Sequence, residues 1–330
     1  MSIDKPLVSV LLPVYNRPNV VHTINSILSQ TFEDFELLIV DNASTDNTVE
    51  EIRKIYDSRI RLVINDINRG QTYSLNRGLE LAKGKYIARI DSDDIALPTR
   101  LEKQVKFLEA NTDFGLCGCW VTYVNDNNEK TITMKMPTSD NGMRTMQNFT
   151  CSMYHPASMF RRSILDEHNI KYADNIKMAE DYYLWGKIME HSKALNLPEV
   201  LLYYHRGSGN DSQIHRDTMI KESFMVREDI CKKQLLDSKE LKKMLDVITI
   251  EKKNKISLFQ TISLYFFYMK YLKSHIKKTD EDFSIIKKYI YMRIYTSCVA
   301  TNTAFFAVFV RKIYQILLAK KYKKGIKINK

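Results

Sequence analysis

The first 110 residues alternate between short apolar runs and segments whose apolar residues recur at helical spacing. The strand-like runs are 7–14, 35–40, 61–64 and 86–90, and the helical segments are 19–29, 48–56, 72–82 and 98–108. This alternation predicts an α/β fold with a doubly wound, mostly parallel sheet. Such sheets bind ligands at the carboxyl ends of their strands, so the polar residues after each strand are the first candidates for a site.

The strongest candidate is the acidic loop directly after 86–90, which contains Asp91, Asp93 and Asp94. Three carboxylates in four residues repel one another unless a cation neutralises them, and Mg²⁺ or Mn²⁺ binds through one or two carboxylates plus substrate phosphates. The alternative is an acidic turn in which Asp93 or Asp94 caps the next helix. Asn16 and Asp41, which follow two other strands, favour the metal site because they would lie at the same edge of the sheet.

The chain has no glycine-rich phosphate loop. Neither Gly-x-x-x-x-Gly-Lys nor Gly-x-Gly-x-x-Gly occurs, so a bound nucleotide would be held by a metal ion and by side chains. The carboxylate of Asp41 is suited to accept a hydrogen bond from a nucleobase N–H. The run 42–46 also has the composition of a helix N-terminus, which is the alternative for this segment.

Charge divides the chain into two parts. Residues 1–214 carry 24 basic and 28 acidic residues, a net charge of −4, whereas residues 215–330 carry 26 basic and 11 acidic ones, a net charge of +15. The second part has apolar residues at helical spacing and aromatic residues among its lysines, at 265–268 and 305–309. We expect a basic helical region at 214–330 that contacts an anionic membrane surface, packs a helical bundle or forms a homo-oligomer.

The composition excludes a disordered chain, and it does not suggest a disulfide-stabilised scaffold. The chain is 44% hydrophobic and 27% charged, which is typical of globular proteins. Its five cysteines are odd in number and form no Cys-x-x-Cys, so we expect reduced thiols. We also expect no secretory leader and no membrane-spanning helix, and therefore a cytoplasmic protein or one peripheral on the inner face of the cytoplasmic membrane.

Five segments in order resemble family 2 glycosyltransferases with the GT-A fold. The segments are Val8–Arg17, Leu38–Asp46, Asn68–Gly70, Ala88–Asp94 and Ala179–Tyr182, of which the last two match the DxD and ED elements of that family. Each segment alone is weak, but all five in order are specific for the family. The resemblance implies a GT-A domain at 1–213, with a nucleotide-sugar half at about 1–112 and an acceptor half at about 113–213.

The resemblance also implies roles for the matching residues. The nucleotide-sugar would be bound by Pro13, Tyr15, Arg17, Asp41, Asn68, Asp91, Ser92, His155 and His205. Asp93 would ligate Mn²⁺ or Mg²⁺, with His205 as a second ligand. Asp181 would be the general base and Glu180 would orient the acceptor, because a carboxylate can take the proton as a hydroxyl attacks. For each histidine a purely structural role is the alternative, and for 180–181 it is an acidic first turn that favours the helix dipole.

One segment departs from the family pattern. Many relatives carry Ala-Arg-Asn before the glycine of the third helix, where this chain has Ser-Leu-Asn-Arg-Gly at 74–78. The arginine contact to the nucleotide is therefore missing, or it is supplied by Arg69 or Arg77.

The sequence thus predicts a metal-dependent inverting glycosyltransferase. It would move a hexose or N-acetylhexosamine from a UDP-sugar to an oligosaccharide or lipid-linked glycan in lipopolysaccharide or capsule synthesis. A sugar nucleotidyltransferase, the first alternative, needs a basic glycine-rich loop near the N-terminus, which is absent. A nucleic-acid-binding protein could use the basic region, but without a recognisable binding motif we expect no nucleic acid partner. A non-catalytic sugar-nucleotide sensor is disfavoured by the presence of Asp93 and Asp181.

Overall fold

The computed structural model describes residues 5–127, 129–207, 214–234 and 258–300. The chain forms two compact units, Met1–Arg227 and Glu228–Lys330. The first unit extends beyond residue 213 because helix α9 (Arg216–Gln234) supplies buried contacts to it. Glu222 accepts hydrogen bonds from the backbone N–H groups of Lys177 and Met178, and the guanidinium of Arg227 donates to the carbonyl of Asn148.

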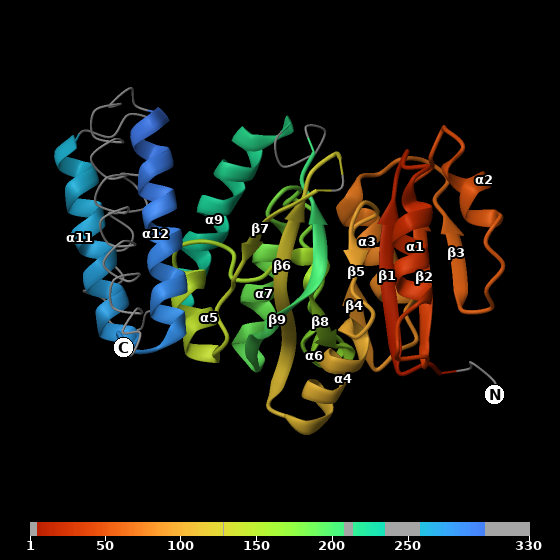
Figure 1. Ribbon diagram of the computed structural model, residues 1–330, viewed down its shortest axis with the longest axis horizontal. Helices are drawn as coiled ribbons and strands as arrows, with labels where there is room; N and C mark the ends of the chain where they lie inside the picture. Colours follow the sequence, from red (N-terminus) through yellow and green to blue (C-terminus); the bar gives the residue numbers. More distant parts are fainter. Residues whose placement is uncertain (1–4, 128, 208–213, 235–257, 301–330) are drawn as a thin grey trace, which may run out of the picture. The chain divides into compact units, whose positions relative to one another are not determined.

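A nine-stranded sheet forms the centre of the first unit (Figure 1). Its strands are β1 (Val8–Val14), β2 (Phe35–Asp41), β3 (Ile60–Ile64), β4 (Tyr86–Arg89), β5 (Ile95–Ala96), β6 (Phe114–Val124), β7 (Lys130–Met134), β8 (Met159–Arg161) and β9 (Lys193–His205). Their order is β3-β2-β1-β4-β8-β6-β9-β5, and β7 pairs with β6. The pairings make β1, β2, β3, β4, β6 and β9 mutually parallel, which confirms the predicted α/β class and mostly parallel sheet.

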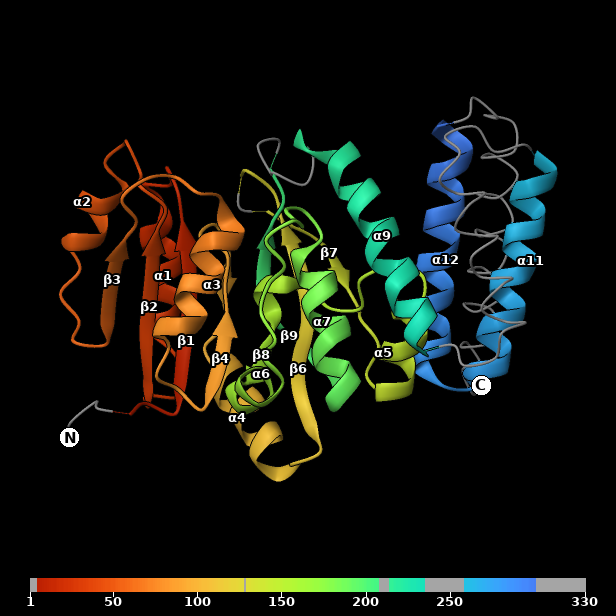
Figure 2. The same ribbon diagram turned by 180° about the vertical axis from the view of Figure 1, so that it is seen from behind.

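Helices cover both faces of this sheet. The helices of the first unit besides α9 are α1 (Val20–Leu28), α2 (Thr48–Arg53), α3 (Gln71–Leu81), α4 (Arg100–Ala110), α5 (Asp140–Gln147), α6 (Arg162–His168) and α7 (Glu180–His191), with a short 3₁₀ turn η1 (His155–Ala157). Figure 2 shows α3 and α7 on one face, where Leu75 and Trp185 join the core side chains Leu11 and Leu38 of the strands. The chain steps from β1 to β2 through α1 and back from β3 to β4 through α3, so right-handed crossovers place α1 and α3 on opposite faces.

Helix α4 begins later than the sequence suggests. The predicted start at residue 98 is wrong, because the helix begins at Arg100 with Thr99 as its N-cap residue. The carbonyl of Pro98 instead accepts a hydrogen bond of 2.8 Å from the backbone N–H of Thr31. Asp93 and Asp94 therefore do not cap this helix, although the loop does form a turn in which the backbone N–H of Asp94 donates to the carbonyl of Asp91.

In the second unit, α11 (Leu258–His275) packs against α12 (Glu281–Ala300). Buried apolar side chains on both helices, among them Tyr268, Leu272 and Ile286, form the contact. None of the described helices has the length and hydropathy of a membrane-spanning segment. The aromatic run at 305–309 lies outside the described residues, and the expected membrane contact and oligomerisation of this region stay predictions.

One glycine of the first unit stands where no side chain fits. A Cβ atom added to Gly84 would lie 2.4 Å from the backbone nitrogen of Ser9 and 2.8 Å from the backbone oxygen of Tyr86. Because these neighbours are backbone atoms of β1 and β4, they cannot move aside. We expect Gly84→Ala to lower the free energy of unfolding by about 3 kcal/mol, at the upper end of overpacking effects, as measured by urea denaturation. Lys83→Ala, an exposed neighbour, is the matched control and should change stability little.

Candidate active site

The carboxyl ends of four parallel strands bring several of the predicted site residues to one edge of the sheet. Tyr15 and Asn16 follow β1, Asp41 ends β2, Asp91 lies two residues after β4, and His205 ends β9. The two-residue strand β5 pairs antiparallel with β9 through Ile95 and Tyr203, which holds the acidic loop against the end of β9. The topology therefore assembles the site from segments up to 190 residues apart, from Tyr15 to His205.

The loops after β1 and β2 are tied to each other. Asn16 and Ala43 both adopt left-handed backbone conformations, with φ of 47° and 60°. The backbone N–H of Asn16 donates to Ser44 Oγ at 2.9 Å. Ser44 in turn donates to both carboxylate oxygens of the buried Asp41, through its N–H and its hydroxyl. Each carboxylate oxygen can accept a second hydrogen bond, but Asp41 has no exposed surface, so its contact with a ligand stays a prediction.

A network of asparagines joins the end of β2 to the loop before α3. The side-chain amide of Asn42 donates to Asn68 Oδ1 at 2.7 Å, and Asn65 Nδ2 donates to Asn42 Oδ1 at 3.1 Å. Of the two arginines considered for the nucleotide, Arg77 donates to Asn65 and to the carbonyl of Ile64, which places it in a structural role. Arg69 lies over the ring of Tyr73 and is exposed, so it is the better candidate of the two.

The acidic loop contains three carboxylates in different environments. Asp94 is fully buried and accepts a 2.8 Å hydrogen bond from the backbone N–H of His205. Asp91 is partly exposed and forms an ion pair with Arg89. Asp93 is also partly exposed, and its Oδ2 lies 3.8 Å from His205 Nδ1. Burial and the charge of Asp91 raise the pKa of Asp93 above its usual range, although the nearby charges of Arg17 and His205 oppose the shift.

These residues fit a divalent cation that is held jointly with a substrate. No cluster of three metal-ligating side chains is preformed among the residues that the structure describes. Burial, followed by the charge of Asp91, disfavours the ionised form of Asp93 and raises its pKa, and a bound cation would stabilise that ionised form. Mg²⁺ and Mn²⁺ commonly take only one or two carboxylates and complete their shell with phosphate oxygens and water. Asp93, with His205 beside it, meets that requirement.

A second carboxylate pair lies at the N-terminus of α7. Glu180 is 7% exposed, and its Oε1 lies 3.9 Å from His155 Nδ1. Asp181 accepts hydrogen bonds from the backbone N–H of Tyr182 at 2.6 Å and from the thiol of Cys151 at 3.6 Å. Burial raises the pKa of Glu180 to about 8, and it raises the pKa of Asp181 to about 6. Both carboxyl groups of the pair are therefore shifted toward neutral pH by their burial.

His155 has buried partners beside this carboxylate pair. Its Nε2 lies 2.8 Å from the hydroxyl of Tyr172, and its ring packs edge-on against Trp185. Burial and the charge of Arg89 lower the pKa of His155 well below its usual range, so the imidazole is neutral. The structure thus gives His155 a structural role, and its predicted contact with a ligand stays a prediction.

The remaining predicted residues lie at the same edge. Tyr15 is 43% exposed, Arg17 is exposed, Pro13 is buried within β1, and Ser92 is partly exposed in the acidic loop. His205 pairs with Asp93 and also with Asp126, whose Oδ1 lies 3.3 Å from its Nε2. No ligand role for any of these residues is established by position alone.

Four residues of the site have no assigned role in the sequence prediction. They are Arg89, Asp126, Cys151 and Tyr172. Asp126 lies in the turn between β6 and β7, where an aspartate is common for turn geometry alone. Arg89 directly precedes the acidic loop but falls in a strand, where a charged residue gives no indication of which partner it meets.

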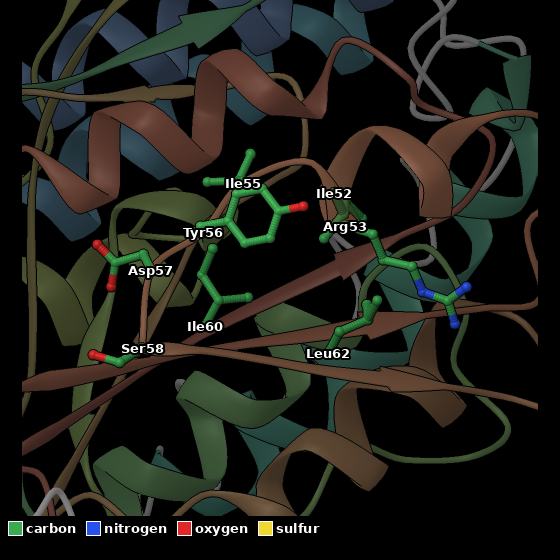
Figure 3. A pocket seen from close by; sticks show the side chains of 8 residues that line it. All are labelled: Ile52, Arg53, Ile55, Tyr56, Asp57, Ser58, Ile60 and Leu62. Atoms are coloured by element: carbon green, nitrogen blue, oxygen red, sulfur yellow. The ribbon is translucent and has the colours of Figure 1, made fainter.

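A pocket of about 540 Å³ lies away from these residues, beside α2 and the edge strand β3 (Figure 3). Its lining residues are Ile52, Arg53, Ile55, Tyr56, Asp57, Ser58, Ile60 and Leu62. None of the predicted site residues lines it, so it is separate from the carboxylate-bearing edge of the sheet.

Comparison with known proteins identifies the family. The profile of the family described as "Glycosyl transferase family 2" matches residues 9–168. The Escherichia coli protein WfaP, named UDP-Glc:alpha-D-GlcNAc-diphosphoundecaprenol beta-1,3-glucosyltransferase, is 33% identical over 234 residues, which cover 67% of this chain and 86% of WfaP. The chain belongs to glycosyl transferase family 2. It is a glycosyltransferase, as the five motifs indicate.

Solved structures of glycosyltransferases share its fold. TarS 1–349 of S. aureus in complex with UDP-GlcNAc has a TM-score of 0.57 at 18% identity, over 93% of this chain and 91% of that one. The mannosyltransferase PcManGT of Pyrobaculum calidifontis, in complex with GDP-Man and Mn²⁺, has a TM-score of 0.54 at 18% identity, over 91% and 86% of the two chains. At these identities the likeness concerns the fold, and it confirms the predicted GT-A architecture.

Proposed function

We propose that this family 2 glycosyltransferase is a metal-dependent, inverting enzyme that transfers a hexose or N-acetylhexosamine from a UDP-sugar to a glycan acceptor. The observation that carries the proposal is the Glu180–Asp181 pair at the start of α7, together with the acidic loop after β4. Burial raises the pKa values of the pair toward neutral pH, and the loop brings three carboxylates together. The first suits proton abstraction and the second suits a cation with a diphosphate.

The chemistry assigns a separate task to each side of the site. Asp181 accepts the proton of the acceptor hydroxyl as that oxygen attacks the anomeric carbon, and Glu180 orients the acceptor. Asp41, held by Ser44, accepts from the base of the nucleotide. A divalent cation held by Asp93 and His205 would offset the charge that develops on the leaving diphosphate. Attack from the side opposite the diphosphate inverts the anomeric carbon.

The similar proteins support the class of donor and acceptor. TarS is solved with UDP-GlcNAc, PcManGT with GDP-Man and Mn²⁺, and the name of WfaP specifies a UDP-Glc donor and a lipid-linked GlcNAc acceptor. We therefore propose a UDP-sugar donor and a lipid-linked or oligosaccharide acceptor in the synthesis of lipopolysaccharide, capsule or a related surface polysaccharide. Such acceptors are consistent with an enzyme that works in the cytoplasm, at the inner face of the membrane, with the basic region at 214–330 near anionic lipid.

Nucleotide titration tests the donor side of this proposal. We expect UDP to bind with Mn²⁺ present and to bind much more weakly when the metal is removed by chelation, because the chain has no glycine-rich cradle for the diphosphate. Isothermal titration calorimetry with UDP and GDP measures both affinities. Preference for GDP would overturn the choice of donor, and the absence of any nucleotide binding would overturn the transferase site itself.

The dependence of turnover on pH tests the acceptor side. Asp181 must be ionised to accept a proton, and burial raises its pKa to about 6. We therefore expect kcat at saturating substrates to fall as the pH is lowered through about 6, well above the usual range for an aspartate. The measurement is kcat between pH 4.5 and pH 8.5. An acid limb near pH 4 would show that the titrating base does not have the raised pKa expected of the buried Asp181.

A further inference from the structure

The thiol of Cys151 lies beside the carboxylate of Asp181, and the proposed mechanism does not use it. Cys151 is partly buried, and its Sγ lies 3.6 Å from Asp181 Oδ2 and 3.2 Å from the carbonyl oxygen of Met153. Sulfur is larger than oxygen, so both distances are compatible with an S–H donor. A thiol carries a single proton, so it donates to one of these two acceptors at a time.

Buried side chains fix the backbone on both sides of Cys151. The guanidinium of Arg227, which is 1% exposed, donates to the carbonyl of Asn148 at 2.9 Å. The amide of Asn196, which has no exposed surface, donates to the carbonyl of Ser152 at 3.1 Å. The position of the thiol is therefore set by buried polar groups from other elements.

The carboxylate of Asp181 is fixed from its other side. The backbone N–H of Tyr182 donates to Asp181 Oδ1 at 2.6 Å, and the hydroxyl of Tyr182 donates to the carbonyl of Gln147, four residues before Cys151. Tyr182 thereby ties the start of α7 to the segment that contains the thiol. Each carboxylate oxygen has two acceptor sites, so Oδ2 can face the thiol and still take a proton from an acceptor hydroxyl.

The thiol keeps its proton at neutral pH. Burial and the negative charge of Asp181 raise the pKa of Cys151 well above its usual range, so Cys151 is a donor here and not a nucleophile. An ionised carboxylate is a stronger acceptor than a peptide carbonyl, and it loses most of that strength when it is protonated. The other titratable and charged groups that act on the two residues from neighbouring elements are Glu180, Arg89 and Asp91, with His155 and Tyr172 beside Glu180 and Arg89.

We propose that Cys151 is a positioning residue for Asp181, whose thiol donates to the ionised carboxylate and turns to the carbonyl of Met153 when that carboxylate takes up a proton. This inference rests on the proposed function in taking Asp181 as the base. The thiol keeps its own proton throughout, so it exchanges hydrogen-bond partners and no covalent bond forms or breaks. Because it donates to the charged form, it orients Asp181 and stabilises it as a base before transfer.

Substitutions at Cys151 should move the pH dependence of turnover. Cys151→Ala removes the donor to ionised Asp181, so we expect the midpoint of the acid limb of kcat to rise by about half a pH unit, the lower end of what one hydrogen bond contributes. Cys151→Ser keeps a donor and should return most of the way to the wild-type midpoint. The matched control is Cys119→Ala, which removes a buried thiol whose acceptor is the carbonyl of Ala157, and it should leave the midpoint unchanged.

Infrared spectroscopy of the S–H stretch tests the contact without substrate, metal or turnover. The frequency of this band falls as the hydrogen bond of the thiol strengthens, and the band of Cys151 is assigned by its loss in Cys151→Ser. We expect the wild-type band to move to higher frequency as the pH is lowered through about 6, the pKa to which burial raises Asp181. In Asp181→Asn the band should not change over this pH range.

Failure of this inference and failure of the proposed function give different results. Full activity of Asp181→Asn would overturn the assignment of the base, while the infrared titration would still decide whether the thiol follows the carboxylate. An S–H band that does not respond to pH, or a kcat midpoint that Cys151→Ala leaves unchanged, would overturn the role of Cys151 and leave the proposed function standing. Circular dichroism checks the fold of each variant. Should Cys151→Ala fail to fold, the infrared titration of the wild-type enzyme decides.

Discussion

Replacing Asp181 with asparagine is expected to lower kcat by about 10²- to 10⁴-fold, the usual contribution of a general base. The amide has nearly the shape of the carboxylate, so it preserves the packing at the start of α7, but it cannot accept the proton of the attacking hydroxyl. Because Asp181 lies on the acceptor side, UDP affinity measured with Mn²⁺ should stay within about twofold of the wild-type value. The kinetic measurement is product formation from a UDP-sugar at saturating acceptor.

The matched control for this variant lies on the same helix. Glu190→Gln makes the same chemical change at the other end of α7, where the carboxylate is exposed and pairs with Lys187. Its kcat should stay within about twofold of the wild-type value, because a surface ion pair contributes little. If Asp181→Asn retains full activity, then Asp181 is not the base and another group takes the proton.

Replacing Asp93 with alanine is expected to abolish the dependence of UDP affinity on Mn²⁺ and to lower kcat/KM by about 10²-fold or more. The magnitude follows from the several kcal/mol of charge stabilisation that a bound metal supplies, with about 1.4 kcal/mol for each factor of ten. Titration calorimetry with and without Mn²⁺ measures the first effect, and initial rates measure the second.

Asp113→Ala is the control for the metal site. Asp113 precedes β6, at the amino end of a parallel strand, and its exposed carboxylate pairs with Lys193. Its removal should leave both UDP affinity and its dependence on Mn²⁺ unchanged. Metal-dependent UDP binding that persists in Asp93→Ala would show that other groups hold the cation, with Asp91 the first to examine.

The sequence predicts the parallel half of the sheet well because each strand and helix there has its own local pattern. The helix after the acidic loop is placed two residues early, since Pro98 is favourable in a first helical turn but is held outside the helix by Thr31, a partner 67 residues away. A hydrogen bond to a residue so distant in sequence cannot be predicted from the residues around Pro98. The strands β8 and β5, of three and two residues, are likewise too short for periodicity to indicate them.

In the candidate site, too, local sequence predicts some features, and others depend on residues from distant segments. Residues that follow a strand directly, such as Asp41 and Asp93, can be predicted because the fold class alone places them at the ligand-binding edge. The environment of each carboxylate could not be predicted. The raised pKa values of Glu180 and Asp181 depend on burial, and Cys151 and Arg89, whose effects oppose the rise for Asp181, come from distant segments.

The assembly of the candidate site from distant segments also determines when the chain becomes active during synthesis. The loops after β1 and β2, which we propose bind the nucleotide, emerge early, but His205 and the helix α9 that anchors the backbone before Glu180 come nearly two hundred residues later. Contacts so distant in sequence form late in folding, because their loop-closure entropy must be overcome first. A nascent chain therefore passes through a long interval in which the donor half is synthesised but transfer is impossible, and any translation product that stops before α9 is expected to be inert.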